Sequence, residues 1–317
     1  MDDERIPDPP VKPLPGDCCG SGCTPCVLDV YQKELALWQS LCNMTPQERA
    51  HWRRTESQKS PKCVGKAALQ PGHYKTFRIM KVDRITECVY KYTFELLPDE
   101  SIGLGAGQHA MLRVWEKEGV AITRPYTPIS PLAQLGSFEV LIKVYEDGRL
   151  TQRLKEWDVG TTADWRGPLG TFTYTPNTYE RVGMLGCGTG IAPLVQLARS
   201  IVDNENDITF VHMLYCCRTQ HDILMKEELD RLASFWNFTV LYALSASSKE
   251  ELAQDPGLVK YGDRVHFGRI GQMEVASCMP TPRERTKVFI CGTSSFEQSM
   301  TSHLIATKFP PSMYFIF

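Results

Sequence analysis

The chain has 317 residues, enough for two domains, with 42% hydrophobic residues, 23% charged residues and a formal net charge of −2. This composition is typical of a globular protein and argues against a disordered chain or a nucleic-acid-binding protein. No apolar run reaches the roughly 20 residues that cross a bilayer, so we expect a cytoplasmic protein without a transmembrane segment.

The first 66 residues differ in composition from the rest. Residues 1–16 are charged and contain five prolines, which predicts a disordered leader. Residues 17–66 begin with clustered cysteines, continue with apolar residues at helical spacing and end in a polar linker. We therefore expect a small Cys-rich helical module ahead of the main domains.

Four cysteines of this module lie within nine positions, and they are Cys18, Cys19, Cys23 and Cys26. Their final C-x2-C pair suits one half of a zinc or iron-sulfur site. No second pair at a matching distance is evident, and reduced thiols, a helix-hairpin core or a redox pair explain the cluster as well. We expect no bound metal and keep these four cysteines as the weak candidates for one.

Short strands separated by turns dominate residues 74–176. We expect them at residues 77–86, 89–97, 108–115, 122–129, 138–145 and 161–165, with a helix at 150–157. Six such strands predict a closed antiparallel β-barrel.

Strands and helices alternate over residues 181–317. Strands are expected at 181–185, 208–217, 238–244, 287–291 and 313–317, and helices at 192–202, 227–235 and from 295 onward. This alternation predicts an α/β domain with an open, doubly wound parallel sheet and crossover helices.

The stretch ITRPYTPIS, residues 122–130, places an arginine inside a predicted strand. The guanidinium of Arg124 can bind a phosphate bidentately, the ring of Tyr126 lies on the same strand face and the hydroxyl of Thr127 is beside it. Such a set suits a phosphate-bearing aromatic cofactor. The alternative is a solvated arginine on an edge strand, where prolines are tolerated.

A glycine-rich loop joins the first strand of the α/β domain to its first helix. It contains Gly186, Gly188 and Gly190. Ligands bind at the carboxyl ends of parallel strands, and a helix N-terminus offers free N–H groups to anions, so the loop suits a dinucleotide pyrophosphate. The spacing differs from G-x-G-x-x-G, and a plain tight turn remains the alternative.

In combination, these segments resemble the ferredoxin-reductase superfamily of flavoproteins and, within it, the NADH-cytochrome b5 reductases. The matching segments are RPYTPIS at 124–130, IKVY at 142–145, RGPLG at 166–170, the glycine loop, RTQHDIL at 218–224 and CG at 291–292. The resemblance implies an enzyme that passes electrons from NADH through FAD to a one-electron acceptor such as cytochrome b5. The Cys-rich stretch resembles a short oxidoreductase-like N-terminal domain, which implies no mechanism.

The resemblance assigns FAD-binding roles to the first large domain. Arg124 binds the pyrophosphate, Tyr126 packs on the flavin, and Thr127 hydrogen-bonds it. Pro125 completes the motif. The other cofactor-binding residues that the resemblance implies, around the flavin and at the helix start that holds the pyrophosphate, are Ile142, Lys143, Tyr145, Gly148, Leu150 and Thr151.

On the nucleotide side, the resemblance places Gly188, Thr189 and Gly190 in the NADH loop, with the Thr189 side chain near the flavin. Cys291 lies close to the nicotinamide and orients it without covalent chemistry, and Gly292 follows. By residue type alone, a buried structural cysteine is the better interpretation of Cys291, and the position that the family gives it reverses that order. Thr189 and Cys291 are the candidate catalytic residues.

Asp222 matches the acidic residue that is associated with NADH preference in this family. A carboxylate there accepts hydrogen bonds from ribose hydroxyls and repels a 2′-phosphate, so NADH should bind better than NADPH. The alternative is that Asp222 caps a helix over ILMKEEL.

The sequence departs from the family pattern in the glycine loop and after Cys291. Cys187 replaces a glycine, Ala192 replaces a threonine, and GTSSF at 292–296 replaces a run of prolines. Loss of that rigid turn predicts looser nicotinamide placement and slow turnover. Two rival functions stay open: a related enzyme that reduces a quinone, iron or another haem protein, and a regulatory metal-binding protein with a degenerate reductase domain.

Overall fold

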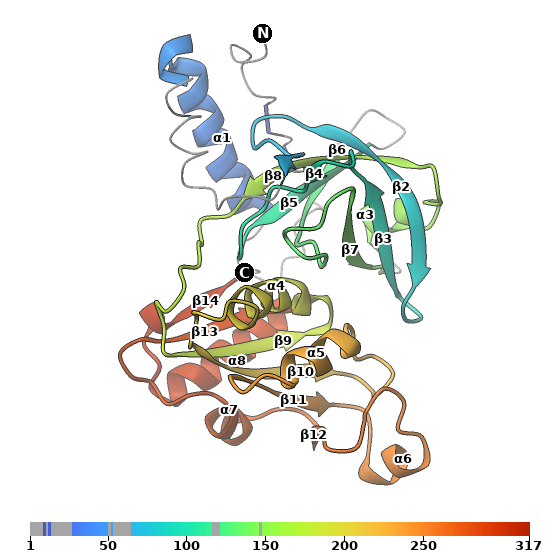
Figure 1. Ribbon diagram of the computed structural model, residues 1–317, viewed down its shortest axis with the longest axis vertical. Coiled ribbons are helices and arrows are strands. Elements are labelled where there is room, and N and C mark those ends of the chain that lie inside the picture. The colour runs from blue at the N-terminus through green and yellow to red at the C-terminus, as the bar shows by residue number, and fades with distance from the viewer. Residues whose placement is uncertain are drawn as a thin grey trace. The chain divides into compact units, whose positions relative to one another are not determined.

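The computed structural model describes residues 9–10, 12–13, 27–49, 52, 65–115, 121–145 and 148–317. The chain divides into two compact units, Met1–Thr173 and Tyr174–Phe317 (Figure 1). The candidate metal ligands Cys18, Cys19, Cys23 and Cys26 lie outside the described residues. None of the helices in the described ranges is long and apolar enough to cross a membrane.

The first unit contains the predicted antiparallel sheet. Its strands, in the order in which they pair, are β6 (Ala121–Tyr126), β5 (His109–Trp115), β8 (Thr162–Leu169), β2 (Lys75–Arg84), β3 (Val89–Glu95) and β7 (Ser137–Lys143). Beyond β6, the Ile129 N–H donates to the Glu139 carbonyl of β7 at 2.8 Å. The chain after one edge strand therefore reaches the other edge, as a barrel requires, although the pairing found in the described residues includes no β6–β7 ladder.

Several boundaries differ from the prediction for physical reasons. β6 ends at Tyr126 rather than at residue 129, because Pro128 cannot donate to a ladder. The predicted helix is the shorter α3 (Arg149–Leu154). A two-residue parallel pair, β1 (Lys66–Ala67) with β4 (Glu100–Ser101), was not predicted, because so short a strand has no periodicity to detect.

The interior of this sheet is filled by aromatic rings. Phe94 stacks on Phe138 at 5.0 Å between ring centroids, and the fully buried Trp165 meets both edge-on at 5.3 and 5.6 Å. Offset and edge-on ring contacts add to the burial of large apolar side chains. These rings therefore join β3, β7 and β8 within the hydrophobic core of the unit.

A cluster of charges ties the N-terminal helix α1 (Val27–Asn43) to the sheet. Arg166 of β8 is only 7% exposed; its guanidinium pairs with Glu34 of α1 and donates to the Pro71 carbonyl at 3.2 Å. The Tyr74 ring lies 5.1 Å from this guanidinium and 3.8 Å from that of Arg113. Burial raises the pKa of Glu34 although Arg166 opposes the shift, so the helix is held by a partly desolvated ion pair.

The second unit contains the predicted parallel sheet. Its strand order is β12 (Arg264–Phe267), β11 (Phe238–Leu244), β10 (Phe210–Cys217), β9 (Arg181–Cys187), β13 (Thr286–Cys291) and β14 (Tyr314–Ile316). The chain starts at β9 in the middle, moves to β10 on one side and later to β13 on the other. This reversal of direction creates a crevice for ligands at the carboxyl ends of β9 and β13.

The helices of this unit are α4 (Ile191–Val202), α5 (Lys226–Ala233), α6 (Lys249–Gln254), α7 (Gln272–Cys278) and α8 (Ser294–Ala306). The prediction missed α6, β12 and α7. Each has at most seven residues, and α6 contains no buried residue, so the apolar periodicity that reveals longer elements is absent.

We expect Glu34→Ala to lower the free energy of unfolding by about 2 kcal/mol, because it leaves the buried Arg166 guanidinium without its carboxylate. Urea unfolding of the full chain measures the change. Glu95→Ala is the matched control, because it removes the partner of Arg78. The side chains of Glu95 and Arg78 are 44% and 60% exposed, so the expected loss of stability is below about 0.5 kcal/mol. Equal losses in the two variants would contradict an anchoring role for Glu34.

Candidate functional site

The glycine loop lies at the switch point of the parallel sheet. After β9 the chain makes a single 3₁₀ turn at Gly188–Gly190, and α4 follows at once. Gly188 has φ +55° and open space where a side chain would stand, and its carbonyl accepts a hydrogen bond from the buried Tyr215 hydroxyl at 2.9 Å. The loop thus presents bare backbone at the start of a helix, which suits a pyrophosphate.

Gly190 brings this loop against the end of β13. A Cβ on Gly190 would clash with the carbonyl of Cys291 and would stand 2.8 Å from the Gly292 nitrogen. Only a residue without a side chain permits this approach. Three predicted nucleotide-site residues from two distant parts of the sequence are therefore brought together.

The Cys291 thiol remains protonated near neutral pH. Burial raises its pKa to about 12, and the nearby Glu297 and Cys187 add to the effect. A thiol in this state is a poor nucleophile. The surroundings of Cys291 therefore suit packing against a ligand rather than covalent chemistry.

The segment after Cys291 begins a regular helix. Thr293 is the N-cap of α8, and its hydroxyl accepts from the Phe296 N–H at 3.4 Å. The Gly292 N–H donates to the Glu297 carboxylate at 3.2 Å. These contacts hold the turn where the family has prolines. Glu297 was not among the predicted site residues, although an acid in the first turn of a helix shortly after a Cys-Gly pair was a visible signal.

Asp222 is not a helix cap, so the alternative considered for it is wrong. The N-cap of α5 is Met225, which has φ +55°, and the helix starts at Lys226. Asp222 lies in the turn after β10, where its carboxylate accepts from the Thr219 N–H at 3.0 Å and the Thr219 hydroxyl at 2.7 Å. The carboxylate is thus held at the carboxyl end of a strand, where a ribose would bind.

Three of the R-P-Y-T residues, Arg124, Pro125 and Tyr126, lie on β6, an edge strand of the first unit, and Thr127 directly follows it. Arg124 is half-buried, and its Nη1 donates to the Thr123 carbonyl at 2.8 Å. Tyr126 meets the buried Trp165 edge-on at 6.1 Å, and burial raises its pKa far above the ordinary value. The alternative of a solvated arginine on an edge strand is therefore half correct. β6 is an edge strand, but Arg124 is not fully solvated.

The other predicted FAD residues fall into two groups. The side chains of Ile142 and Leu150 are buried in the hydrophobic core, which leaves their main chain for a ligand. The Thr151 hydroxyl instead ties together the loop before α3, since it bonds to the Tyr145 main chain and donates to the Gly148 carbonyl at 3.1 Å.

The two remaining predicted residues of IKVY, Lys143 and Tyr145, are closer to the protein surface than Ile142. Tyr145 is 50% exposed, and the Lys143 ammonium lies 5.5 Å from the centre of its ring. An exposed aromatic ring beside a cation fits a site for a large anionic cofactor.

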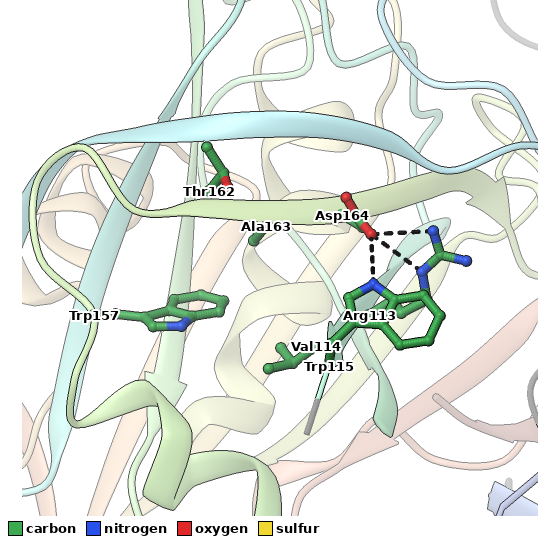
Figure 2. A pocket seen from close by; sticks show the side chains of 7 residues that line it. All are labelled: Arg113, Val114, Trp115, Trp157, Thr162, Ala163 and Asp164. Atoms are coloured by element: carbon green, nitrogen blue, oxygen red, sulfur yellow. Dashed lines mark hydrogen bonds and ion pairs between the residues drawn. The ribbon is translucent and has the colours of Figure 1, made fainter. Parts of the chain in front are cut away.

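A pocket of about 250 Å³ lies elsewhere in the first unit (Figure 2), lined by Arg113, Val114, Trp115, Trp157, Thr162, Ala163 and Asp164. The Asp164 carboxylate accepts from the Arg113 Nη2 at 3.0 Å and from the Trp115 indole at 3.2 Å. Pockets that hold drug-sized ligands occupy roughly 300–1,000 Å³. This pocket is too small for a dinucleotide, and none of its residues was assigned to one.

The described residues contain no group of three His, Cys, Asp or Glu side chains that could hold a metal ion. The residues at the two predicted cofactor sites instead fit organic groups. Gly188 leaves its backbone open at the start of α4, with no atom within 4 Å of where a Cβ would stand, and β6 offers a guanidinium and a partly buried phenol. This donor set suits a nucleotide and a flavin rather than a cation.

Comparison with known proteins gives three family-model matches: an oxidoreductase FAD-binding domain at residues 76–174, an oxidoreductase NAD-binding domain at 184–302 and an oxidoreductase-like protein N-terminal domain at 4–46. These matches confirm both predicted cofactor-binding domains and the N-terminal resemblance.

Curated relatives match nearly the full length. The Homo sapiens protein "NADH-cytochrome b5 reductase-like" is 39% identical over 308 residues, which cover 97% of this chain and 94% of the relative. "NADH--cytochrome b5 reductase 1" of Arabidopsis thaliana is 33% identical over 266 residues, 83% of this chain and 89% of the relative. The cytochrome b5 reductase domain of Ulva prolifera nitrate reductase matches with a TM-score of 0.69 and 22% identity, covering 79% of this chain and all of that one; it supports the fold.

We expect Gly190→Ala to destabilise the protein by about 3 kcal/mol, because the added methyl overlaps the β13 backbone. Gly188→Ala meets open space and costs about 1–2 kcal/mol for its positive φ. Urea unfolding measures both values. A larger loss of stability in Gly188→Ala than in Gly190→Ala would contradict the close contact between the loop and Cys291.

Proposed function

Because the chain belongs to the NADH-cytochrome b5 reductase family of flavoprotein oxidoreductases, we propose that it passes electrons from NADH through FAD to cytochrome b5. The observation that carries the proposal is the contact of the Gly188–Gly190 turn with Cys291 and Gly292 at the switch point of the parallel sheet. Two loops that meet there supply a backbone cradle for the pyrophosphate and a protonated thiol for the nicotinamide.

In the first unit, Arg124 would neutralise the FAD pyrophosphate, since a guanidinium binds phosphate oxygens through paired N–H groups. Tyr126 would pack on the flavin, held by its contact with Trp165. Thr127 and Pro125 complete the motif, while the main chain around Gly148 would approach the phosphates closely. When bound, FAD links two-electron oxidation of NADH to one-electron steps.

In the second unit, Gly188, Thr189 and Gly190 would bind the NADH pyrophosphate. Cys291 would pack on the nicotinamide, and its protonated state keeps a negative charge away from that ring. These residues would position the nucleotide. Because the hydride step takes no proton from the protein, it needs no acid or base side chain. The proposed acceptor, cytochrome b5, needs no pocket, because electrons transfer between surfaces.

An anaerobic titration of the purified protein with NADH tests the proposal. We expect the visible flavin absorbance to bleach at low excess of NADH and to return on addition of oxidised cytochrome b5. Parallel reduction rates for a quinone, ferric iron and another haem protein separate cytochrome b5 from the rival acceptors. A colourless protein that takes up no added FAD would overturn the proposal. The cytoplasmic location stays a prediction, which cell fractionation tests.

We expect Arg124→Gln to weaken FAD binding by at least about tenfold, because it removes the charge-assisted bonds to the pyrophosphate. Equilibrium dialysis of FAD against the apoprotein measures the loss. Arg78→Gln removes an exposed arginine of β2 in the same unit, so its FAD affinity should equal that of the wild type. Unchanged affinity in Arg124→Gln would remove the pyrophosphate role from this residue.

We expect Asp222→Asn to narrow the preference for NADH over NADPH by about tenfold. The amide keeps an oxygen for the two Thr219 bonds but lacks the charge that repels a 2′-phosphate. Ratios of kcat/KM for the two nucleotides measure the preference. Thr219→Ala is the control that weakens the turn and leaves the charge. A ratio that changes in Thr219→Ala but not in Asp222→Asn would show that Asp222 acts only through the turn.

A further inference from the structure

Glu297 is a buried acid beside the proposed nicotinamide site, and the family resemblance gives it no role. It lies in the first turn of α8 and is 6% exposed. Its Oε1 accepts the Gly292 N–H at 3.2 Å. Within the described part of the chain, no ion pair links it to a cation. A carboxylate that is buried without a positive partner is costly, so its retention needs an explanation.

The titratable groups around Glu297 do not offset this cost. Glu297 lies close enough to Cys291 of β13 to raise the pKa of its thiol, and Cys187 of β9 raises that pKa as well. Further along α8, His303 acts on Glu274 of α7. Burial raises the pKa of Glu297 to about 7, and the bond from Gly292 lowers it only in part. The side chain therefore changes charge within the physiological range.

The Gly292 peptide is held from two directions. On one side, the Cys291–Gly292 backbone packs against the Cα of Gly190. On the other side, Glu297 accepts its N–H, and the Phe296 ring leaves no room for a Cβ at Gly292. The first contact is steric and permanent, whereas the strength of the second depends on the charge of the carboxylate, since an ionised acceptor forms the stronger hydrogen bond.

We propose that Glu297 is a positioning residue for the nicotinamide nucleotide, whose ionised carboxylate fixes the Cys291–Gly292 turn and thereby couples NADH binding to pH. The inference rests on the proposed function of this site. In the CGTSSF segment, the carboxylate provides the restraint that prolines provide in the family. Above pH 7 the turn is held and NADH binds tightly; below pH 7 the neutral carboxyl holds it weakly.

Steady-state kinetics of the FAD-loaded full chain test the proposal, with ferricyanide as the electron acceptor, from about pH 5.5 to about pH 8.5. We expect the KM for NADH to fall about fivefold as pH rises through 7, with kcat changing less than about twofold. Glu297→Gln should keep the higher KM at every pH, because its amide oxygen accepts the Gly292 N–H without a charge.

Glu274→Gln is the matched control. Glu274 also accepts a glycine N–H at the start of a helix, from Gly271 at 2.9 Å, but it lies on α7, is only partly buried, and its hydrogen bonds hold its pKa below the ordinary value. This variant should keep the wild-type pH profile. The proposal is overturned if Glu297→Gln retains the pH-dependent KM, or if Glu274→Gln loses it.

A spectroscopic readout avoids both activity and mutation. In the ¹⁵N-labelled wild type, the Gly292 amide resonance should shift with a midpoint near pH 7, because its acceptor changes charge there. An amide that does not titrate overturns the proposal, even if Glu297→Gln does not fold. Failure of the proposed function looks different: the wild type then oxidises no NADH at any pH, while full activity with a flat pH profile refutes only the role of Glu297.

Discussion

The approach of Gly190 to the Cys291–Gly292 backbone is the constraint on which the nucleotide site depends. β9 and β13 are neighbours in the sheet, with Cys291 opposite Gly186 in the register, so their carboxyl ends lie one strand spacing apart. At that separation, the turn that leaves β9 must pass directly over the end of β13. A side chain in the turn would push the two loops apart, so the absence of one at Gly190 determines whether a shared site forms.

The buried Glu297 shows that this site is not optimised for stability. The pKa of its carboxyl is 4.5 in an ordinary environment and about 7 in the fold, so the native state holds the proton more tightly than the unfolded chain does. Its contribution to stability is therefore full below pH 4.5 and is lost as pH rises to 7. An acid that destabilises the fold at neutral pH is consistent with the positioning role proposed for it, since costly groups gather at functional sites.

Sequence reasoning recovered the parts of the fold that local pattern specifies. The parallel sheet, the antiparallel strands and the glycine loop all follow from periodicity and turn chemistry. The Glu34–Arg166 ion pair could not be predicted in this way, because its partners are 132 positions apart in sequence and no local signal relates them. Asp222 was open to misreading as a helix cap because α5 begins after Met225, a residue type that rarely adopts a positive φ. The roles of the assigned residues toward FAD and NADH remain predictions.

The departures from the family pattern argue for a working site rather than a degenerate one. Cys187 replaces a glycine, but its φ of −138° is extended backbone that any residue adopts. Ala192 replaces a threonine inside α4, where alanine is the better helix former. Glycine is kept at Gly188, where φ is positive, and at Gly190, where no side chain fits. A degenerate domain would change residues without regard to backbone φ or to the space for a Cβ. This chain differs from the family where the backbone accepts any residue, and it keeps glycine where only glycine fits.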